Sequence, residues 1–207
     1  MSKRNKTRGK LYIISGPSGT GKGTICSRIM EERKLSLSIS MTTRAPRDGE
    51  KDGQSYYFVT KEEFENKIKE DKMLEYAKVF DNYYGTPKDK VISRLERGID
   101  VILEIDIQGG LQVRSKMPED SVLIFILPPS LEELKNRLIA RGTESIEAIE
   151  KRLSKALDEI RFIGEYDYYI VNDDLEKAVG EALSIVDAER LRVPPKVKPI
   201  IRQYEEE

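Results

Sequence analysis

The sequence predicts an α/β fold in which a parallel β-sheet is covered by helices on both faces. Short apolar runs rich in β-branched residues are typical of strands that are buried on both sides. Along this chain such runs alternate with segments whose apolar residues recur every three or four positions, as on one face of a helix. A glycine-rich loop joins the first apolar run to the first helical segment. Ligands of such sheets bind at the carboxyl ends of the strands, which is where this loop lies.

Each predicted element has its own signal in the sequence. Within the first helical segment, Ile25 and Ile29 lie four residues apart. Ser130 and Glu133 form a capping box, which predicts the start of a later helix. The predicted strands are residues 11–15, 101–105, 122–127 and 168–171, and the predicted helices are 21–34, the segment after Ser130, 146–163 and 175–191.

Residues 36–90 interrupt this alternation. Residues 37–41 alternate between apolar and polar side chains, and residues 56–59 are apolar, so both segments predict strands. Thr60 and Glu63 form a second capping box, which predicts a helix after them. Short strands together with one helix predict a small α+β insertion in the main fold.

The glycine-rich loop fits the phosphate-binding pattern G-x-x-x-x-G-K-[ST] at Gly16, Gly21 and Lys22. Glycines let the backbone curl so that several N–H groups point inward, and the helix N-terminus behind them favours an anion. The loop therefore predicts a nucleoside triphosphate site, and a glycine-rich turn without a ligand is the alternative. The residues expected at the triphosphate are Gly16, Pro17, Ser18, Gly19, Thr20, Gly21, Lys22, Gly23 and Thr24.

One position departs from the phosphate-binding pattern. Where the pattern has a hydroxyl for Mg²⁺, this chain has Gly23, followed by Thr24. The variant G-K-G-T resembles the loop of adenylate kinases and some other nucleoside monophosphate kinases, in which the loop contributes less to holding the metal. We therefore expect Mg²⁺ to bind with ATP mostly through water and phosphate oxygens, with Glu104 or Asp106 as candidate carboxylates.

Composition narrows the chemistry and the partners. A chain of 207 residues predicts one compact domain with room for inserted subdomains. It has no histidine, which excludes histidine bases and His-ligated zinc. The net charge of −1 and the lack of a long apolar stretch or secretory signal predict neither nucleic acid nor membrane as a partner. The single cysteine, Cys26, indicates a reducing compartment and a place in the core, so we expect a cytoplasmic protein.

A second anion site is predicted inside the insertion. Arg44 and Arg47 lie three residues apart around Pro46, and their guanidinium groups can converge on one phosphate. Tyr56 and Tyr84 offer hydroxyl donors nearby. At this point the chain resembles the guanylate kinases, which phosphorylate GMP to GDP with ATP. The shared motifs are S-M-T-T-R-A-P-R-D-G-E at 40–50, G-Q-S-Y-Y-F-V at 53–59, L-E-Y-A at 74–77, N-Y-Y-G-T at 82–86, L-E-I-D-I-Q-G at 103–109, L-P-P-S at 127–130, R-L at 137–138, R-G-T-E at 141–144, K-R-L at 151–153 and V-N-D-D-L at 171–175.

The resemblance implies roles for individual residues. Glu75 suits guanine because a carboxylate accepts from N1–H and from the N2 amino group together, whereas adenine presents an acceptor at N1. The implied GMP phosphate contacts are Arg44, Arg47, Tyr56 and Tyr84, the implied guanine contacts are Ser40, Glu75, Thr86 and Asp106, the implied ATP contacts beyond the loop are Arg137, Asn172 and Asp173, and the implied catalytic residues are Lys22, Arg47, Arg141 and Arg152.

Taken singly, several of these residues have ordinary structural interpretations. Arg47 or Glu75 alone would be an exposed surface charge. Tyr83 and Tyr84 would be packing aromatics. Asp106, at the end of a strand, would cap the helix that follows it. Their joint spacing, as in the guanylate kinases, is what favours the functional interpretation.

The third arginine cluster comprises Arg137, Arg141 and Arg152. The resemblance implies that they belong to a lid over the triphosphate, and a solvated helix with Glu132, Glu133 and Glu144 as ion-pair partners is the alternative. In-line transfer of the γ-phosphoryl group to GMP agrees with a chain without histidine. A phosphate monoester has its second pKa at about 6, so the acceptor needs no general base.

The expected architecture is a P-loop NTPase-type parallel sheet with an inserted α+β GMP-binding subdomain and a helical lid. The expected substrates are ATP and GMP, and the sequence leaves open whether the chain forms a homo-oligomer. A non-catalytic guanylate-kinase-like interaction domain and a kinase for another monophosphate, such as AMP or a sugar phosphate, are the alternatives. The predicted organisation is a basic tail over 1–10, a domain over 11–193 (core 11–35, 91–130 and 165–193, insertion 36–90, lid about 131–164) and a C-terminal tail over 194–207.

Overall fold

The core of the protein is a five-stranded parallel sheet in the order β2-β7-β1-β8-β9. The computed structural model describes residues 8–79, 81–140, 145–193 and 197–205. The strands of this sheet are β1 (Leu11–Ser15), β2 (Leu35–Leu37), β7 (Asp100–Glu104), β8 (Ser121–Leu127) and β9 (Tyr168–Val171). The predicted α/β fold is confirmed.

The central strand β1 explains why the first apolar run is so continuous. Helices cover both faces of the sheet, so all five residues of β1 are buried. Ile14 lies opposite Glu104 of β7 on one side and Ile124 of β8 on the other. The carboxyl ends of these three strands therefore meet at one edge, next to the loop after β1.

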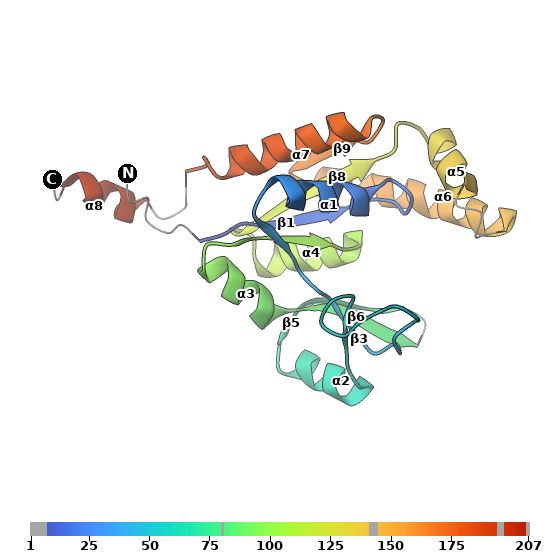
Figure 1. Cartoon of the computed structure of the whole chain (residues 1–207), viewed down its shortest axis with the longest axis horizontal. Helices are drawn as coiled ribbons and strands as arrows, with labels where there is room; N and C mark the ends of the chain where they lie inside the picture. The colour runs from blue at the N-terminus through green and yellow to red at the C-terminus, as the bar shows by residue number, and fades with distance from the viewer. Residues whose placement is uncertain (1–7, 80, 141–144, 194–196, 206–207) are drawn as a thin grey trace.

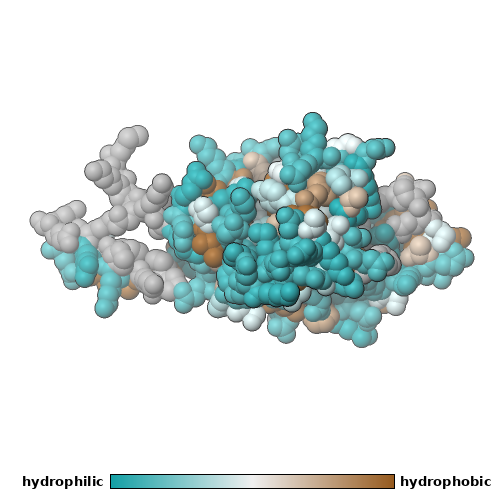
Figure 2. Space-filling view, turned by 90° about the horizontal axis from the view of Figure 1, so that it is seen from below, coloured by the Kyte–Doolittle hydropathy of each residue, from teal (hydrophilic) through white to brown (hydrophobic). Residues whose placement is uncertain are grey.

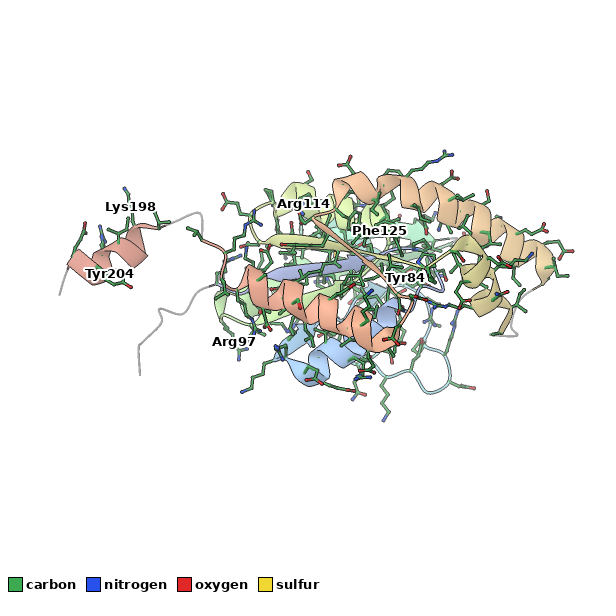
Figure 3. The ribbon with its side chains drawn as sticks, turned by 90° about the horizontal axis from the view of Figure 1, so that it is seen from above. Tyr84, Arg97, Arg114, Phe125, Lys198 and Tyr204 are labelled. Atoms are coloured by element: carbon green, nitrogen blue, oxygen red, sulfur yellow. The ribbon has the colours of Figure 1, made fainter. Side chains whose placement is uncertain are left out.

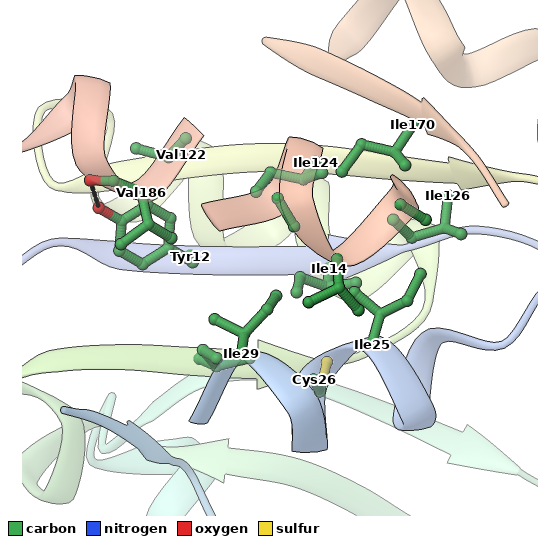
Figure 4. Packing of buried hydrophobic residues seen from close by; sticks show 14 residues of the cluster. Tyr12, Ile14, Ile25, Cys26, Ile29, Val122, Ile124, Ile126, Ile170 and Val186 are labelled. Carbon is green, nitrogen blue, oxygen red and sulfur yellow. Dashed lines mark hydrogen bonds between the residues drawn. The ribbon is translucent and has the colours of Figure 1, made fainter. Parts of the chain in front are cut away.

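Two apolar layers hold the helices to the sheet. On one face, α1 (Lys22–Glu32) and α7 (Leu175–Glu189) pack on a cluster that includes Tyr12 and Ile124 (Figure 4). Cys26 of α1 lies in this cluster at 2% exposure, as expected, and burial raises its thiol pKa to about 12. On the other face, α3 (Lys88–Glu96) and α4 (Ile107–Lys116) pack on Ile13 and Leu123.

The insertion forms a second sheet with its own small core. The order is β4-β3-β6-β5, and β5 and β6 form its antiparallel hairpin. In this unit Phe64 of the helix stacks on Tyr83 at 5.2 Å between ring centroids, and the capping box at Thr60 and Glu63 is confirmed. Figure 1 shows this unit below the core sheet. Its elements are β3 (Met41–Thr42), β4 (Tyr57–Phe58), α2 (Lys61–Lys69), β5 (Met73–Val79) and β6 (Asn82–Pro87).

The structure differs from the predicted strand over 37–41. Residues up to Leu37 belong to β2 of the core sheet, and β3 of the insertion begins only at Met41. Between them, Ser38 N–H donates to Ile102 O of β7 at 2.9 Å, which extends the core pairing by one residue. Leu37 is exposed whereas Ser38 is buried, so the alternation of apolar and polar residues here does not follow burial and does not reveal where the chain changes sheets.

The segment that was expected to form a lid contains α5 (Leu131–Ala140) and α6 (Ile146–Ile160), here called the lid helices or the lid, and a short 3₁₀ helix, η1 (Arg161–Glu165), continues α6. The two helices share a small apolar cluster that includes Leu134 and Ile149. The predicted N-terminal cap is present, because Glu133 N–H donates to Ser130 Oγ at 3.0 Å. The lid lies at one end of the molecule in Figure 1.

The opposite end carries α8 (Lys198–Glu205), a helix within the stretch that the sequence suggested was a tail. Lys198 and Tyr204 lie apart from the main body in Figure 3, and Tyr204 is exposed. Hydrophilic residues cover most of the face in Figure 2. Within the described ranges, the helices are too short or too polar to span a membrane.

Candidate active site

The loop after β1 is shaped by glycines at positions that other residues would strain. Gly16, Gly19 and Gly21 have φ values of 142°, 96° and 88°. A Cβ at Gly16 would lie 2.2 Å from Ile126 O, so the start of the loop passes directly against the end of β8. Only glycine allows the two backbones to approach this closely, and the loop then continues into α1.

Charge and hydroxyl groups lie around this loop. Lys22 Nζ donates to Gly16 O at 2.7 Å and to Pro17 O at 2.9 Å. The hydroxyl of Thr20, which is fully buried, donates back to Pro17 O at 3.0 Å. From α6 of the lid, Arg152 donates to Ser18 Oγ at 2.8 Å. A cation from the helix start and a cation from the lid thus meet at the glycine-rich loop.

The outer side of the loop is backed by the end of β9 and by the lid. The Asn172 side chain donates to Thr20 O at 2.8 Å and is buried. Its backbone carbonyl accepts from Arg137 at 3.0 Å, and Arg137 also pairs with Glu133 at 2.9 Å. Arg137 therefore pairs with Glu133, as expected for a solvated helix, and it also contacts the segment beside the loop. Asp173 is exposed.

Gly23 faces a carboxylate. A Cβ at this position would lie 3.4 Å and 3.5 Å from the two oxygens of Glu104, at the end of β7. A carboxylate beside a phosphate loop fits a hydrated Mg²⁺, which prefers oxygen ligands and usually keeps several waters. Among the described residues no three His, Cys, Asp or Glu side chains gather as a metal site of their own, so substrate phosphates would have to supply further ligands.

A pocket of about 330 Å³ opens between the insertion and the core sheet. Glu75 and Tyr84 come from the insertion, whereas Glu104 and Asp106 come from the end of β7 and the start of α4. The lining residues are Ser40, Tyr56, Glu75, Ala77, Val79, Tyr84, Gly85, Glu104, Ile105 and Asp106.

Glu75 is a buried carboxyl group at the floor of this pocket. It is 5% exposed and accepts a 2.6 Å hydrogen bond from the hydroxyl of Thr86. Burial raises its pKa to about 7; the Thr86 hydrogen bond opposes this rise, and the negative charge of Asp106 adds to it. Asp106 itself caps α4 by accepting from Gly109 N–H at 2.8 Å, as its ordinary structural interpretation predicted, while it also lines the pocket.

The two insertion arginines differ in their surroundings. Arg44 donates to both oxygens of Glu50 at 2.9 Å and lies 5.6 Å from the centroid of the Tyr56 ring. Glu50 also accepts from the Arg47 N–H at 2.8 Å, and these bonds hold the pKa of Glu50 below its usual range. The side chain of Arg47 is exposed. Tyr56 and Tyr84 pack edge to face at 6.0 Å, beside Arg44.

The structure brings most of the expected residues into two adjoining groups. Ser40, Tyr56, Glu75, Tyr84 and Asp106 line the pocket, with Thr86 behind Glu75. The loop, Lys22, Arg152, Arg137 and Asn172 form the other group. Arg141 lies outside the described residues.

Two contributors were not expected from the sequence. Glu50 pairs with Arg44, and the only sequence signal for it is its six-residue distance from that arginine. The Gln112 side chain of α4 both donates to Tyr76 O and accepts from Tyr76 N–H, each at 3.2 Å, and so ties β5 to the core. No local pattern marks this contact, because the two segments meet only in the folded chain.

The chain is similar in sequence to guanylate kinases over most of its length. The family model described as guanylate kinase matches residues 8–189. The chain is 56% identical to a guanylate kinase of Clostridium tetani over 186 residues, covering 90% of this chain and 89% of that one. It is 56% identical to the guanylate kinase of Caldanaerobacter subterraneus subsp. tengcongensis over 189 residues, covering 91% of each chain.

A solved structure agrees with these sequence matches. The crystal structure of guanylate kinase from Anaplasma phagocytophilum has a TM-score of 0.72 and 35% identity to this chain. That match covers 90% of this chain and 89% of the other. Together with the phosphate loop and the pocket beside it, these matches show that the chain belongs to the guanylate kinase family.

Proposed function

We propose that this protein transfers the γ-phosphoryl group of ATP to GMP, giving ADP and GDP. One observation supports this most directly: Glu104 lines the insertion pocket and also lies beside Gly23 at the end of the phosphate loop. The phosphate loop and the pocket therefore adjoin at one carboxylate. A nucleoside triphosphate on the loop and a monophosphate in the pocket would have their phosphates close together.

In this reaction a phosphate oxygen of GMP forms a bond to the γ-phosphorus while the bond from that phosphorus to the bridging oxygen of ADP breaks. No proton has to be removed first from a dianionic acceptor. The protein's task is to bring two polyanions together and to neutralise charge as it shifts. We assign this to Lys22 and Arg152 at the loop and to Arg47 in the insertion, and we expect the same of Arg141.

The insertion would hold GMP by both of its ends. Arg44 and Arg47, with Tyr56 and Tyr84, would bind the phosphate, since guanidinium groups pair bidentately with phosphate oxygens. Glu75, Ser40, Thr86 and Asp106 would surround the guanine. The loop residues 16–24 would hold the triphosphate of ATP, with Arg137 and Asp173 on the nucleoside side.

Mg²⁺ bound with ATP would neutralise phosphate charge. We expect Glu104 to help to hold its water shell, because the Glu104 carboxylate lies beside Gly23. The side chain that usually supplies a hydroxyl is missing at that position, so the substrate phosphates would supply direct ligands.

A panel of nucleoside monophosphates tests this proposal. In a coupled assay of ADP release, GMP should support turnover at rates far above those with AMP, CMP or UMP. ADP release with AMP instead of GMP would replace the guanine assignment with another monophosphate. No monophosphate-dependent ADP release at all would favour the interaction-domain alternative.

A further inference from the structure

Asn172 lies behind the phosphate loop, where it holds the loop's backbone. The residue is 6% exposed, and its side-chain amide Nδ2 donates to Thr20 O at 2.8 Å. We propose that Asn172 is a positioning residue for the phosphate loop, acting through the peptide between Thr20 and Gly21. This inference rests on the proposed ATP site and differs from the direct ATP contact that the resemblance implied for Asn172.

The geometry of a peptide group explains how such a contact would work. In a trans peptide the C=O and the next N–H point in opposite directions. With Asn172 binding the carbonyl of Thr20 from behind, the N–H of Gly21 points away from Asn172. One side-chain hydrogen bond thus sets the direction of a main-chain donor immediately before Lys22. A loop that binds phosphate through its N–H groups depends on that direction.

Gly21 and Asn172 are matched to each other. Gly21 has φ 88°, and a Cβ on it would lie 2.4 Å from Asn172 Nδ2. Gly21 is therefore needed for two reasons: its left-handed backbone, and the close approach of this amide.

Asn172 also connects the loop to the lid. Its N–H donates to Leu127 O at 2.9 Å, which anchors it to the end of β8. Its own carbonyl accepts from Arg137 of α5 at 3.0 Å. The contact to Thr20 therefore comes from a backbone that is fixed by the core sheet on one side and by the lid on the other.

The test compares wild type with Asn172→Ala and with Asn172→Asp, which keeps the side chain's size but removes its N–H donors. Two measurements are made on the full chain. Hydrogen exchange without nucleotide reports on the amides of the loop, and competition binding measures the dissociation constants of ATP and of inorganic tripolyphosphate, which has no adenine. GMP affinity serves as the folding control, and Asn66→Ala, at an exposed asparagine of α2, is the matched control.

If Asn172 positions the loop, both variants should exchange the loop amides at least several-fold faster than wild type. The dissociation constants of ATP and of tripolyphosphate should rise by the same factor, on the order of tenfold for a lost hydrogen bond to a buried partner. GMP affinity should stay within about twofold of wild type, and the Asn66→Ala protein should match wild type throughout.

Two results would overturn the inference. One is loop exchange equal to that of wild type in both variants. The other is weaker ATP binding with unchanged tripolyphosphate binding, which would mean that Asn172 contacts adenine. Failure of the proposed function has different signatures: without the ATP site the wild-type protein itself would bind neither ATP nor tripolyphosphate, and without the GMP site the wild-type protein would not bind GMP. The exchange measurement still decides the role of Asn172 in that case, because it needs no ligand.

Discussion

Replacing Glu75 with glutamine should make the ligand-free protein more stable while it weakens GMP binding. Glu75 is 5% exposed, and burial raises its pKa from the ordinary 4.5 to about 7. A raised carboxyl pKa means that the folded state binds the proton more tightly than the unfolded chain. The stability from this proton is fully present below pH 4.5 and is lost as the pH rises through 7.

The size of the effect follows from the two pKa values. One pKa unit corresponds to about 1.4 kcal/mol, so at pH 8 the ionised Glu75 costs the folded protein about 3 kcal/mol. At pH 5 the cost of ionising Glu75 in the folded protein is less than about 1 kcal/mol, because the carboxyl group is then mostly protonated. Glutamine is never ionised, and its Oε1 can still accept from Thr86. Glu75→Gln should therefore raise the free energy of unfolding by up to about 3 kcal/mol at pH 8, or the melting temperature by roughly 6–12 °C.

Urea denaturation at pH 5 and pH 8 measures this difference. Glu181→Gln, at an exposed glutamate of α7, is the matched control and should change stability by less than about 0.5 kcal/mol at both values. The reasoning would be refuted if the free energies of unfolding of wild type and Glu75→Gln differed by the same amount at pH 5 and at pH 8. In the same variant GMP should bind roughly 10- to 100-fold more weakly, because a charged acceptor for two guanine donors is lost.

Three further substitutions test other parts of the site. Arg47→Ala should lower kcat by about 10³-fold, and it should have little effect on the free energy of unfolding because the Arg47 side chain is exposed. Arg97→Ala, at another exposed arginine, is the control and should keep full activity. Near-normal turnover of the Arg47→Ala protein would remove Arg47 from the mechanism. Gly16→Ala should lower the free energy of unfolding, measured by urea denaturation, by about 3 kcal/mol or more, because its Cβ would lie 2.2 Å from a carbonyl oxygen. Gly180→Ala, at a position of α7 with no neighbouring atom within 4 Å of its Cβ, should instead raise the free energy of unfolding. Gln112→Ala should raise KM for GMP by roughly three- to tenfold and leave KM for ATP unchanged, since it frees the backbone next to Glu75; equal changes in both constants would contradict this role.

Much of the fold could be predicted because the main sheet leaves a strong local signal. Strands such as β1 are buried on both faces, so an unbroken apolar run marks them. The β5–β6 hairpin carries no such signal. Glu75 lines the pocket and Thr86 lies behind it, so buried polar residues interrupt the apolar pattern of both strands.

The candidate site likewise combines residues that a local sequence pattern marks with contacts that no local pattern marks. The phosphate loop is local in sequence, because Gly16, Gly19, Gly21 and Lys22 all lie in one short stretch of the chain. Contacts between distant segments left no pattern: Asn172 reaches Thr20 across 152 positions, and Arg152 reaches Ser18 across 134. The resemblance implied that Asn172 and Arg152 lie near ATP, but their contacts with Thr20 and Ser18 become apparent only after the strand ends have been placed at one edge of the sheet.

The separate apolar core of the insertion has a consequence for how the protein opens. Among the described residues, Met41, Phe64 and Met73 form its fully buried part, whereas the layers on the main sheet are several times larger. A unit with so little buried surface should open by sub-global unfolding at a lower free energy than the core. Amide exchange in the free protein should therefore show two classes, with α2 and β3–β6 exchanging first. GMP should slow only that class, because its pocket is built mainly on the insertion.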